Sequence, residues 1–153
     1  MSFFQSLNIS ATGLTAQRLR MDVISENVAN VNTTRTADGG PYRRRTVLFQ
    51  EQSPGSPFSS HLRDALNRQG IGKPFQGHGV RVSRIVTDTR PGPRVHDPSH
   101  PDANAEGYVM MPNVNVVTEM VNMISASRAY EANITAMNTT RTMLQRTLDI
   151  GSR

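Results

Sequence analysis

The stretch from Asn115 to Asp149 contains neither proline nor glycine and repeats its apolar residues every seven positions. One row holds Val116, Met123, Tyr130, Met137 and Leu144, and a second row, offset by four, holds Met120, Ser127, Ile134, Arg141 and Leu148. These are a and d positions of a heptad pattern, which predicts a helix that packs along another helix. At about 1.5 Å per residue this helix is roughly 50 Å long. A core built from 153 residues is too small to cover it.

The other end of the chain supplies a partner. Residues 2–30 predict a second helix, opened by a weak capping box of Ser2 and Gln5. Its heptad row consists of Leu7, Leu14, Met21 and Val28, with Phe4 and Ala11 in the offset row before Arg18 and Ser25 interrupt it. We expect the two terminal helices to pair in space as a coiled-coil-like hairpin.

Between the helices the sequence changes character. All nine prolines lie between Pro41 and Pro112, and nine of the eleven glycines lie between Gly39 and Gly107. Both residue types disfavour helix, so the chain divides into a terminal helical domain, residues 1–31 and 115–150, and a small β-rich middle domain, residues 32–114. The predicted fold class is therefore α+β.

Three short strands are expected in the middle domain. They are Tyr42–Gln50, which is rich in β-formers, Val80–Val86, which alternates apolar and polar residues, and Tyr108–Met111. Three strands of this length form one small sheet that needs the helices or neighbouring chains for support. The segments 62–67, 70–79 and 91–101 are predicted as a short helical turn and two loops.

Composition narrows the possible functions. The chain has 17 basic and 12 acidic residues, a net charge of +5, but its arginines are dispersed and Arg43–Arg45 is the only dense run. A basic coiled-coil adaptor that binds nucleic acid or an anionic membrane is thus an alternative hypothesis rather than the leading one. With no cysteine, no disulfide can form. No cleavable signal peptide and no bilayer-spanning stretch is visible in the sequence.

The sequence offers only weak evidence for a metal-binding, phosphate-binding or catalytic site. His96 and His100 have a metal-ligand spacing, but Pro98 prevents the helix that would place them on one face. Residues 70–73 resemble a phosphate-binding loop, yet Pro74 stands where Ser or Thr would hold magnesium. No nucleophile and base can be paired from the sequence. We expect neither an enzyme nor a cofactor or metal.

Asn27, Asn30 and Thr33 form an N-x-x-N-x-x-T motif at the end of the first predicted helix. Six further segments carry recognisable motifs: Gly40–Arg44, His100–Ala103, Gly107–Val109, Pro112–Val114, Glu119–Ile124 and, most specifically, Ser127–Asn133. In these segments the chain resembles the bacterial flagellar rod proteins, most closely the proximal-rod C type, the FlgC family, and the N-x-x-N-x-x-T motif resembles the signature that follows the first helix in rod and hook proteins. Residues 52–79 match no motif of the family.

The resemblance implies a structural subunit of the basal-body rod, a helical tube that transmits torque across the periplasm. It also implies export by the flagellar apparatus, partners among other rod subunits and copies of the chain itself, contact with the membrane-embedded basal ring, and no nucleic-acid ligand. The expected assembly interface consists of the heptad residues Leu7, Leu14, Met21, Val28, Val116, Met120, Met123, Tyr130, Ile134, Met137, Leu144 and Leu148.

Overall fold

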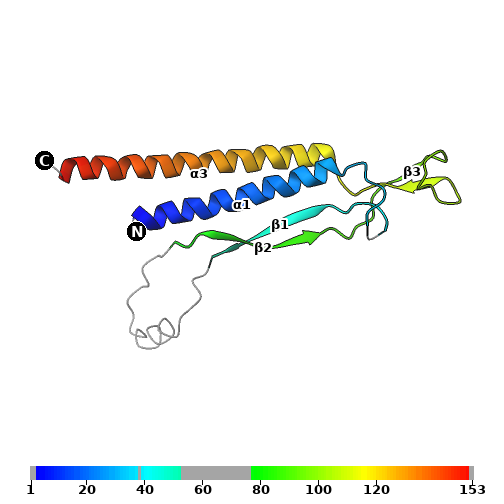
Figure 1. Cartoon of the computed structure of the whole chain (residues 1–153), viewed down its shortest axis with the longest axis horizontal. Helices are drawn as coiled ribbons and strands as arrows, with labels where there is room; N and C mark the ends of the chain where they lie inside the picture. Colours follow the sequence, from blue (N-terminus) through cyan, green and yellow to red (C-terminus); the bar gives the residue numbers. More distant parts are fainter. Residues whose placement is uncertain (1–2, 38, 53–76, 152–153) are drawn as a thin grey trace, which may run out of the picture.

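The computed structural model describes residues 3–37, 39–52 and 77–151. Two long helices dominate it, α1 (Phe3–Ala29) and α3 (Val116–Gly151), and they lie side by side and antiparallel (Figure 1). Both expected terminal helices are therefore confirmed to within a residue or two at each end. None of the helices described is long and apolar enough to cross a lipid bilayer.

The β part consists of two separate hairpin-like pairs. Strand β1 (Arg45–Glu51) pairs antiparallel with β2 (Val80–Thr87), with a bulge between Leu48 and Phe49. Strand β3 (Arg94–His96) pairs antiparallel with β4 (Tyr108–Met110). The α+β class is confirmed, but the expected single sheet is wrong, because the described strands form two sheets of two strands.

Two predictions about the strands differ in detail from the structure. The first strand begins at Arg45 rather than Tyr42, because Tyr42 is buried in a turn where its N–H donates to the carbonyl of Thr33. The segment 91–101, predicted as a loop, contains β3, a strand of three residues that is defined only by its pairing with β4. Such a short strand carries no local pattern that sequence reasoning could detect. The predicted turn at 62–67 and most of the loop 70–79 fall outside the described residues.

Helix α1 is the middle layer of the molecule. It packs against α3 on one side and against the β1–β2 sheet on the other, while the β3–β4 pair projects from the end where α1 finishes and α3 begins (Figure 1). The start of β2 approaches α1 closely: the Thr12 hydroxyl accepts a hydrogen bond from the Val80 amide at 3.1 Å. A side chain at Gly79 would collide with Thr12, so the absence of a Cβ permits this contact.

The face of α3 that meets α1 matches the predicted heptad pattern only in part. The row Met123, Tyr130, Met137 and Leu144 is half-buried, as expected. The other buried positions are Glu119 and Ala126, whereas Met120, Ile134 and Leu148 of the predicted second row are exposed. The predicted second row is thus wrong for the pairing within this chain. The helices approach closely at Gly13 of α1, where the polar side chain of Asn133 on α3 faces the glycine.

Candidate functional site

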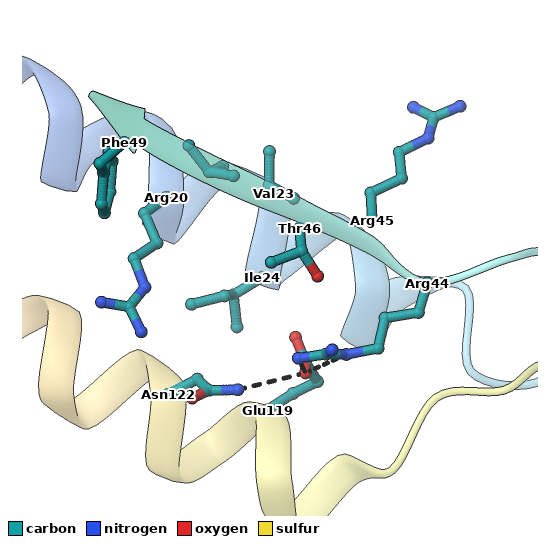
Figure 2. A pocket seen from close by; sticks show the side chains of 10 residues that line it. Arg20, Val23, Ile24, Arg44, Arg45, Thr46, Phe49, Glu119 and Asn122 are labelled. Carbon is teal, nitrogen blue, oxygen red and sulfur yellow. Dashed lines mark hydrogen bonds and ion pairs between the residues drawn. The ribbon is translucent and has the colours of Figure 1, made fainter. Parts of the chain in front are cut away.

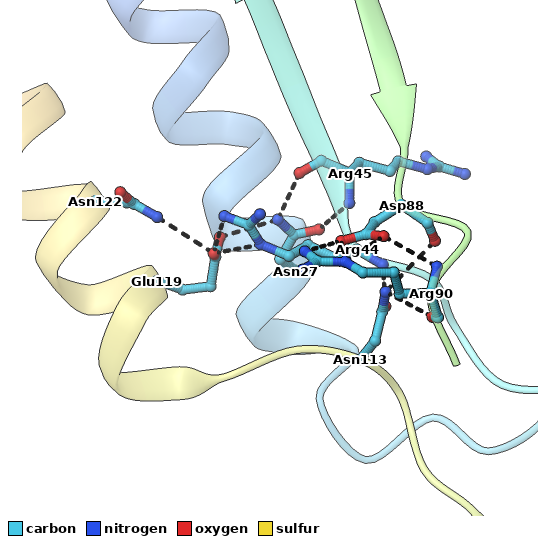
Figure 3. A network of polar contacts seen from close by, with 8 residues as sticks. All are labelled: Asn27, Arg44, Arg45, Asp88, Arg90, Asn113, Glu119 and Asn122. Atoms are coloured by element: carbon cyan, nitrogen blue, oxygen red, sulfur yellow. Dashed lines mark hydrogen bonds and ion pairs between the residues drawn. The ribbon is translucent and has the colours of Figure 1, made fainter. Parts of the chain in front are cut away.

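The most concentrated set of polar contacts joins α1, α3 and the start of β1. We call it the junction, and define it as the side chains of Asn27, Tyr42, Arg44 and Glu119 together with the main chain of Arg45. Figure 3 shows these residues except Tyr42. Asn27 and Glu119 are the largest fully buried side chains, each with 0% exposure, and Tyr42 is also buried. Buried polar groups on this scale persist only when their hydrogen bonds are satisfied.

Asn27 satisfies all four hydrogen-bonding positions of its amide. Its Nδ2 donates to the Arg45 carbonyl at 2.8 Å and to Oε2 of Glu119 at 2.9 Å. Its Oδ1 accepts from the Arg45 amide and from the Tyr42 hydroxyl, both at 2.9 Å. The side chain therefore pairs with both main-chain groups of Arg45, much as a neighbouring strand would. This contact fixes where β1 starts relative to α1.

Glu119 carries the only ion pair of the described residues in which one partner is almost fully buried. Its Oε1 accepts from Nε of Arg44 at 2.8 Å and from Nη2 of the same residue at 2.7 Å. Asn122 adds a longer contact at 3.4 Å, one turn further along α3. Because Arg44 immediately precedes β1, the pair attaches the sheet to α3, which among the described helices and strands otherwise packs only on α1.

The rest of the N-x-x-N-x-x-T signature shapes the turn that leads out of α1. The Nδ2 of Asn30 donates to the carbonyl of Glu26 at 2.9 Å, which satisfies an acceptor at the end of the helix. Its Oδ1 accepts from the Thr33 hydroxyl at 3.1 Å, and the Thr33 carbonyl accepts from the Tyr42 amide. The structure thus brings together the three signature residues: Asn27 binds β1 and α3, while Asn30 and Thr33 direct the chain toward Tyr42.

A second asparagine pair organises the return of the chain into α3. Asn113 accepts from the Arg44 amide at 2.7 Å and donates to the carbonyl of Arg90 at 3.1 Å (Figure 3). Two residues on, Asn115 caps α3, since its Oδ1 accepts from the Thr118 amide at 3.0 Å. These contacts hold the segment 112–115 in place, and its capping residue, rather than the heptad pattern, sets the start of α3.

Beside the junction lies an open cleft of about 250 Å³, between α1, β1 and α3 (Figure 2). Its charged groups are Arg20, Arg44, Arg45 and Glu119, and its apolar wall includes Ile24 and Phe49. Arg44 and Glu119 bind each other, and Arg45 binds Glu26 at 2.7 Å. Both oxygens of the Glu119 carboxylate are therefore already bound, Oε1 by Arg44 and Oε2 by Asn27. The cleft contains a structural ion pair rather than a free acid or base that could catalyse a reaction.

The histidines have structural contacts. His96 stacks edge-on against Tyr108 with 5.0 Å between ring centroids, and Nδ1 of His100 accepts from the Asp102 amide at 3.1 Å. In the described part of the chain no three His, Asp or Glu side chains lie close enough to hold a metal ion. The segment 70–73, which resembles a phosphate loop, falls outside that part.

The predicted interface residues divide into two groups in the structure. Half-buried positions are Leu7, Leu14, Met21 and Val28 on α1, and Met123, Tyr130, Met137 and Leu144 on α3. Exposed positions are Val116, Met120, Ile134 and Leu148. Sequence reasoning missed Tyr42, Arg44 and Glu119 as members of the junction. The sequence did contain a signal for two of them. Glu119 is the lone carboxylate in the apolar first turn of the C-terminal helix, and Arg44 lies in the only dense run of basic residues.

Comparison with known proteins shows which protein families match this chain. The family described as "Flagella basal body rod protein" matches residues 7–35, and the family described as "Flagellar basal body rod FlgEFG protein C-terminal" matches residues 105–150. Both matched segments contain junction residues, Asn27 in the first and Glu119 in the second.

Relatives match along the whole chain. The chain is 51% identical to the flagellar basal-body rod protein FlgC of Bacillus subtilis, with 99% of each chain covered. It is 49% identical to FlgC of Borreliella burgdorferi over 98% of each chain, and 38% identical to FlgC of Salmonella typhimurium over 99% of each. Identity of this size over the full length of several relatives confirms the resemblance that the sequence motifs indicated. The chain belongs to the FlgC family of flagellar basal-body rod proteins.

Proposed function

We propose that this chain builds the flagellar rod by packing its terminal helices, α1 and α3, among those of neighbouring subunits. Membership of the FlgC family makes the chain a structural subunit of the basal-body rod and not an enzyme. The comparisons give no support to the alternative of a basic adaptor for nucleic acid or membranes.

One observation carries the proposal: the second half of α3 has half-buried but no fully buried side chains within its own chain. The fully buried residues of this helix are Glu119 and Ala126, so from residue 127 to its end at Gly151 no side chain is fully buried. A helix gains most of its stability from packing an apolar face, and an isolated helix is marginal. The half-buried row Met123, Tyr130, Met137 and Leu144 therefore has room for additional neighbours, as a coiled-coil-like bundle of subunits would supply.

The helical and the β-rich layers of the molecule have different roles in the rod. The helix pair, residues 1–31 and 115–150, forms the inner layer of the rod, and the β-rich residues 32–114 form its outer layer. The junction holds the two layers at one angle in every copy, which lets the rod carry torque across the periplasm. Its partners are copies of this chain, other rod subunits, the membrane-embedded ring at the base and, during secretion, the flagellar export apparatus.

The test introduces a charge into the helix pair. Met137→Asp or Leu144→Asp places a carboxylate where packed neighbours leave it unhydrated, which costs several kcal/mol per site when the charge has no partner. We expect no rod assembly and no motility from either variant when it replaces the parent gene. Leu14→Asp and Met21→Asp should act in the same way on α1.

Two controls make the result specific. Thr135→Asp adds the same charge to an exposed position of α3, and Lys73→Ala changes a residue of the segment 52–79, which matches no motif of the family, so both should leave motility near normal. Secretion and the helical content of each purified variant are measured alongside, to separate assembly from export and folding. A secreted, helical Met137→Asp chain that still builds working rods would contradict the proposal.

A further inference from the structure

Strand β1 pairs with β2 along one edge and, among the described strands, has no neighbour along the other. The Arg44 carbonyl accepts from the Asp88 amide, and the Gln52 amide donates to the Gly79 carbonyl, so the even-numbered residues from 44 to 52 turn their main-chain groups toward β2. The residue skipped by the bulge belongs to β2, which leaves the alternation of β1 unbroken. The odd-numbered residues from 45 to 51 therefore present their N–H and C=O groups to the free edge.

Asn27 covers only the first position of this free edge. Its side chain binds both main-chain groups of Arg45. Within the described chain, no hydrogen bond reaches the outward main-chain groups of Val47, Phe49 or Glu51. A row of unpaired donors and acceptors at a strand edge is a template for one more strand.

Helix α1 leaves this part of the edge uncovered because it crosses the sheet at an angle. At one end Asn27 lies beside Arg45 of β1, whereas at the other end Thr12 binds Val80 of β2, the residue that pairs with Glu51. The helix thus passes from β1 to β2, and the edge of β1 opens on the side of α3. The cleft of about 250 Å³ lies at this opening, between β1, α1 and α3 (Figure 2).

The cleft contains one cation that is not neutralised. Its other two arginines are each bound by a glutamate, whereas Arg20 forms no ion pair with any described residue. Arg20 lies two helical turns before Asn27 on α1, and Figure 2 shows it next to Phe49. One turn closer to Asn27, Ile24 adds an apolar wall. An occupant of the edge therefore meets a positive charge near Phe49 and apolar surface beside it.

We propose that the free edge of β1 binds an extended segment of a partner protein as a third, antiparallel strand, with a glutamate or aspartate opposite Phe49. Directly opposed residues of antiparallel strands share a face, so this acidic side chain lies on the α1 side of the sheet, where Arg20 is. The residue two positions away, opposite Val47, is apolar and meets Ile24. Main-chain hydrogen bonds supply the affinity of such a strand, and its alternate side chains supply the selectivity.

A synthetic peptide tests the edge on the purified, isotope-labelled full chain. The probe is acetyl-Thr-Val-Thr-Glu-Thr-Val-Thr-amide, and NMR should show shifted amide resonances at Val47, Phe49 and Glu51. N-methylation of the peptide's Glu and two Val residues, whose amides face β1, should abolish binding. N-methylation of its two central Thr residues on either side of the Glu, whose amides face water, is the matched control and should leave the affinity nearly unchanged.

The charge is tested separately. Exchanging the peptide's Glu for Gln, or making Arg20→Gln in the chain, should weaken binding roughly fivefold, and the two changes together should weaken it no further. Arg18→Gln, at an exposed position of the same helix, should bind the peptide as the parent does. Leu144→Asp should also bind it normally, so failure of this site and failure of the proposed helix assembly are distinguishable.

The natural occupant is identified in isolated basal bodies that carry photoreactive p-benzoylphenylalanine in place of Phe49. Illumination should link this position to one segment that has an acidic residue and an apolar residue two positions away. A peptide that fails to shift the three edge amides, or that binds equally well with either set of N-methyl groups, overturns the added strand. Equal binding of the Gln peptide overturns the acidic partner, as does a photoproduct at a segment without a carboxylate or no photoproduct at all.

Discussion

Asn27 occupies a position that needs two donors and two acceptors on one short planar side chain. The amide meets this need, since each of its four hydrogen-bonding positions has a partner within 2.9 Å. Aspartate has nearly the same shape but no donors when ionised, and it places a second negative charge beside Glu119. The first asparagine of the N-x-x-N-x-x-T signature is therefore explained by its position, where three elements meet.

Asn27→Asp replaces the side-chain amide nitrogen by an oxygen, and we expect it to be the most disruptive substitution of this size in α1. It removes two donated hydrogen bonds, leaves the Arg45 carbonyl unpaired and adds repulsion to Glu119, with a loss of about 3–5 kcal/mol by analogy with broken buried ion pairs. Chemical denaturation of the purified chain measures the loss. Asn8→Asp, at an exposed position of the same helix, is the matched control and should change stability by about 0.5 kcal/mol or less. Equal stability of the two variants would contradict the role assigned to Asn27.

The phenol of Tyr42 gives the junction a measurable pH dependence. Burial raises the pKa of Tyr42 above its ordinary value of 10.0, and the carboxylates of Glu26 and Glu119 raise it further against the opposing effect of Arg45. The folded chain thus holds this proton more tightly than the unfolded chain does. Below pH 10 the Tyr42 proton makes its full contribution to the free energy of unfolding. This contribution declines as the pH rises from 10 toward the pKa of Tyr42 in the folded chain.

We therefore expect the free energy of unfolding to fall above about pH 10 more steeply in the parent than in Tyr42→Phe. Tyr42→Phe should be less stable at neutral pH, because Oδ1 of Asn27 loses one donor. The curves of stability against pH, measured by denaturation at each pH, should approach each other in alkaline solution. Tyr108→Phe, at an exposed tyrosine, is the control. Parallel curves for parent and Tyr42→Phe would show that this phenol is not linked to folding.

At the scale of elements, the sequence predicted which segments are helices better than it predicted how they face each other. The heptad pattern and the confinement of proline and glycine to the middle were enough to place α1 and α3, because both signals are local. The pairing face depended on Gly13, Ala16, Ala126 and the buried Glu119, which carry little apolar weight in a heptad count. Strand β3 and the junction contacts of Arg44 depend on residues far apart in the chain, which no local pattern encodes.

Gly13 tests how close α1 and α3 must be. A Cβ built at this position would lie 2.8 Å from Oδ1 of Asn133, whose Nδ2 is held by the Ala129 carbonyl at 2.8 Å. We expect Gly13→Leu to cost about 1–3 kcal/mol by overpacking, despite the better helix propensity of leucine. Asn133→Ala combined with Gly13→Leu should recover part of this loss, because it removes the obstructing amide. Thermal unfolding of the four chains measures the coupling, and strictly additive effects would show that the two residues do not meet.

At the scale of the whole molecule, packing is graded from one end of the helix pair to the other. Near the junction Val23, Ile24 and Asn27 of α1 and Glu119 and Ala126 of α3 are buried. Toward the free end α1 has no fully buried residue before Gly13, and α3 has none after Ala126. A structure with this distribution opens most easily where few groups are buried. Exposed apolar side chains at the two ends of α3, among them Val117, Val121, Leu148 and Ile150, add apolar surface that the single chain leaves in water.

Amide hydrogen exchange should reveal this gradient in the dilute, unassembled chain. We expect slow exchange in residues 20–29 and 116–127, which pack around the junction, and fast exchange in residues 3–10 and 140–151, where helix ends fray without tertiary support. In isolated basal bodies the same distal residues should become protected, because neighbouring copies then cover them. Asn27→Asp should speed exchange at the junction end of the free chain and so flatten the gradient. Uniform protection along both helices of the monomer would mean that the chain completes its own packing, and the rod would then have to assemble through surfaces other than the terminal helices.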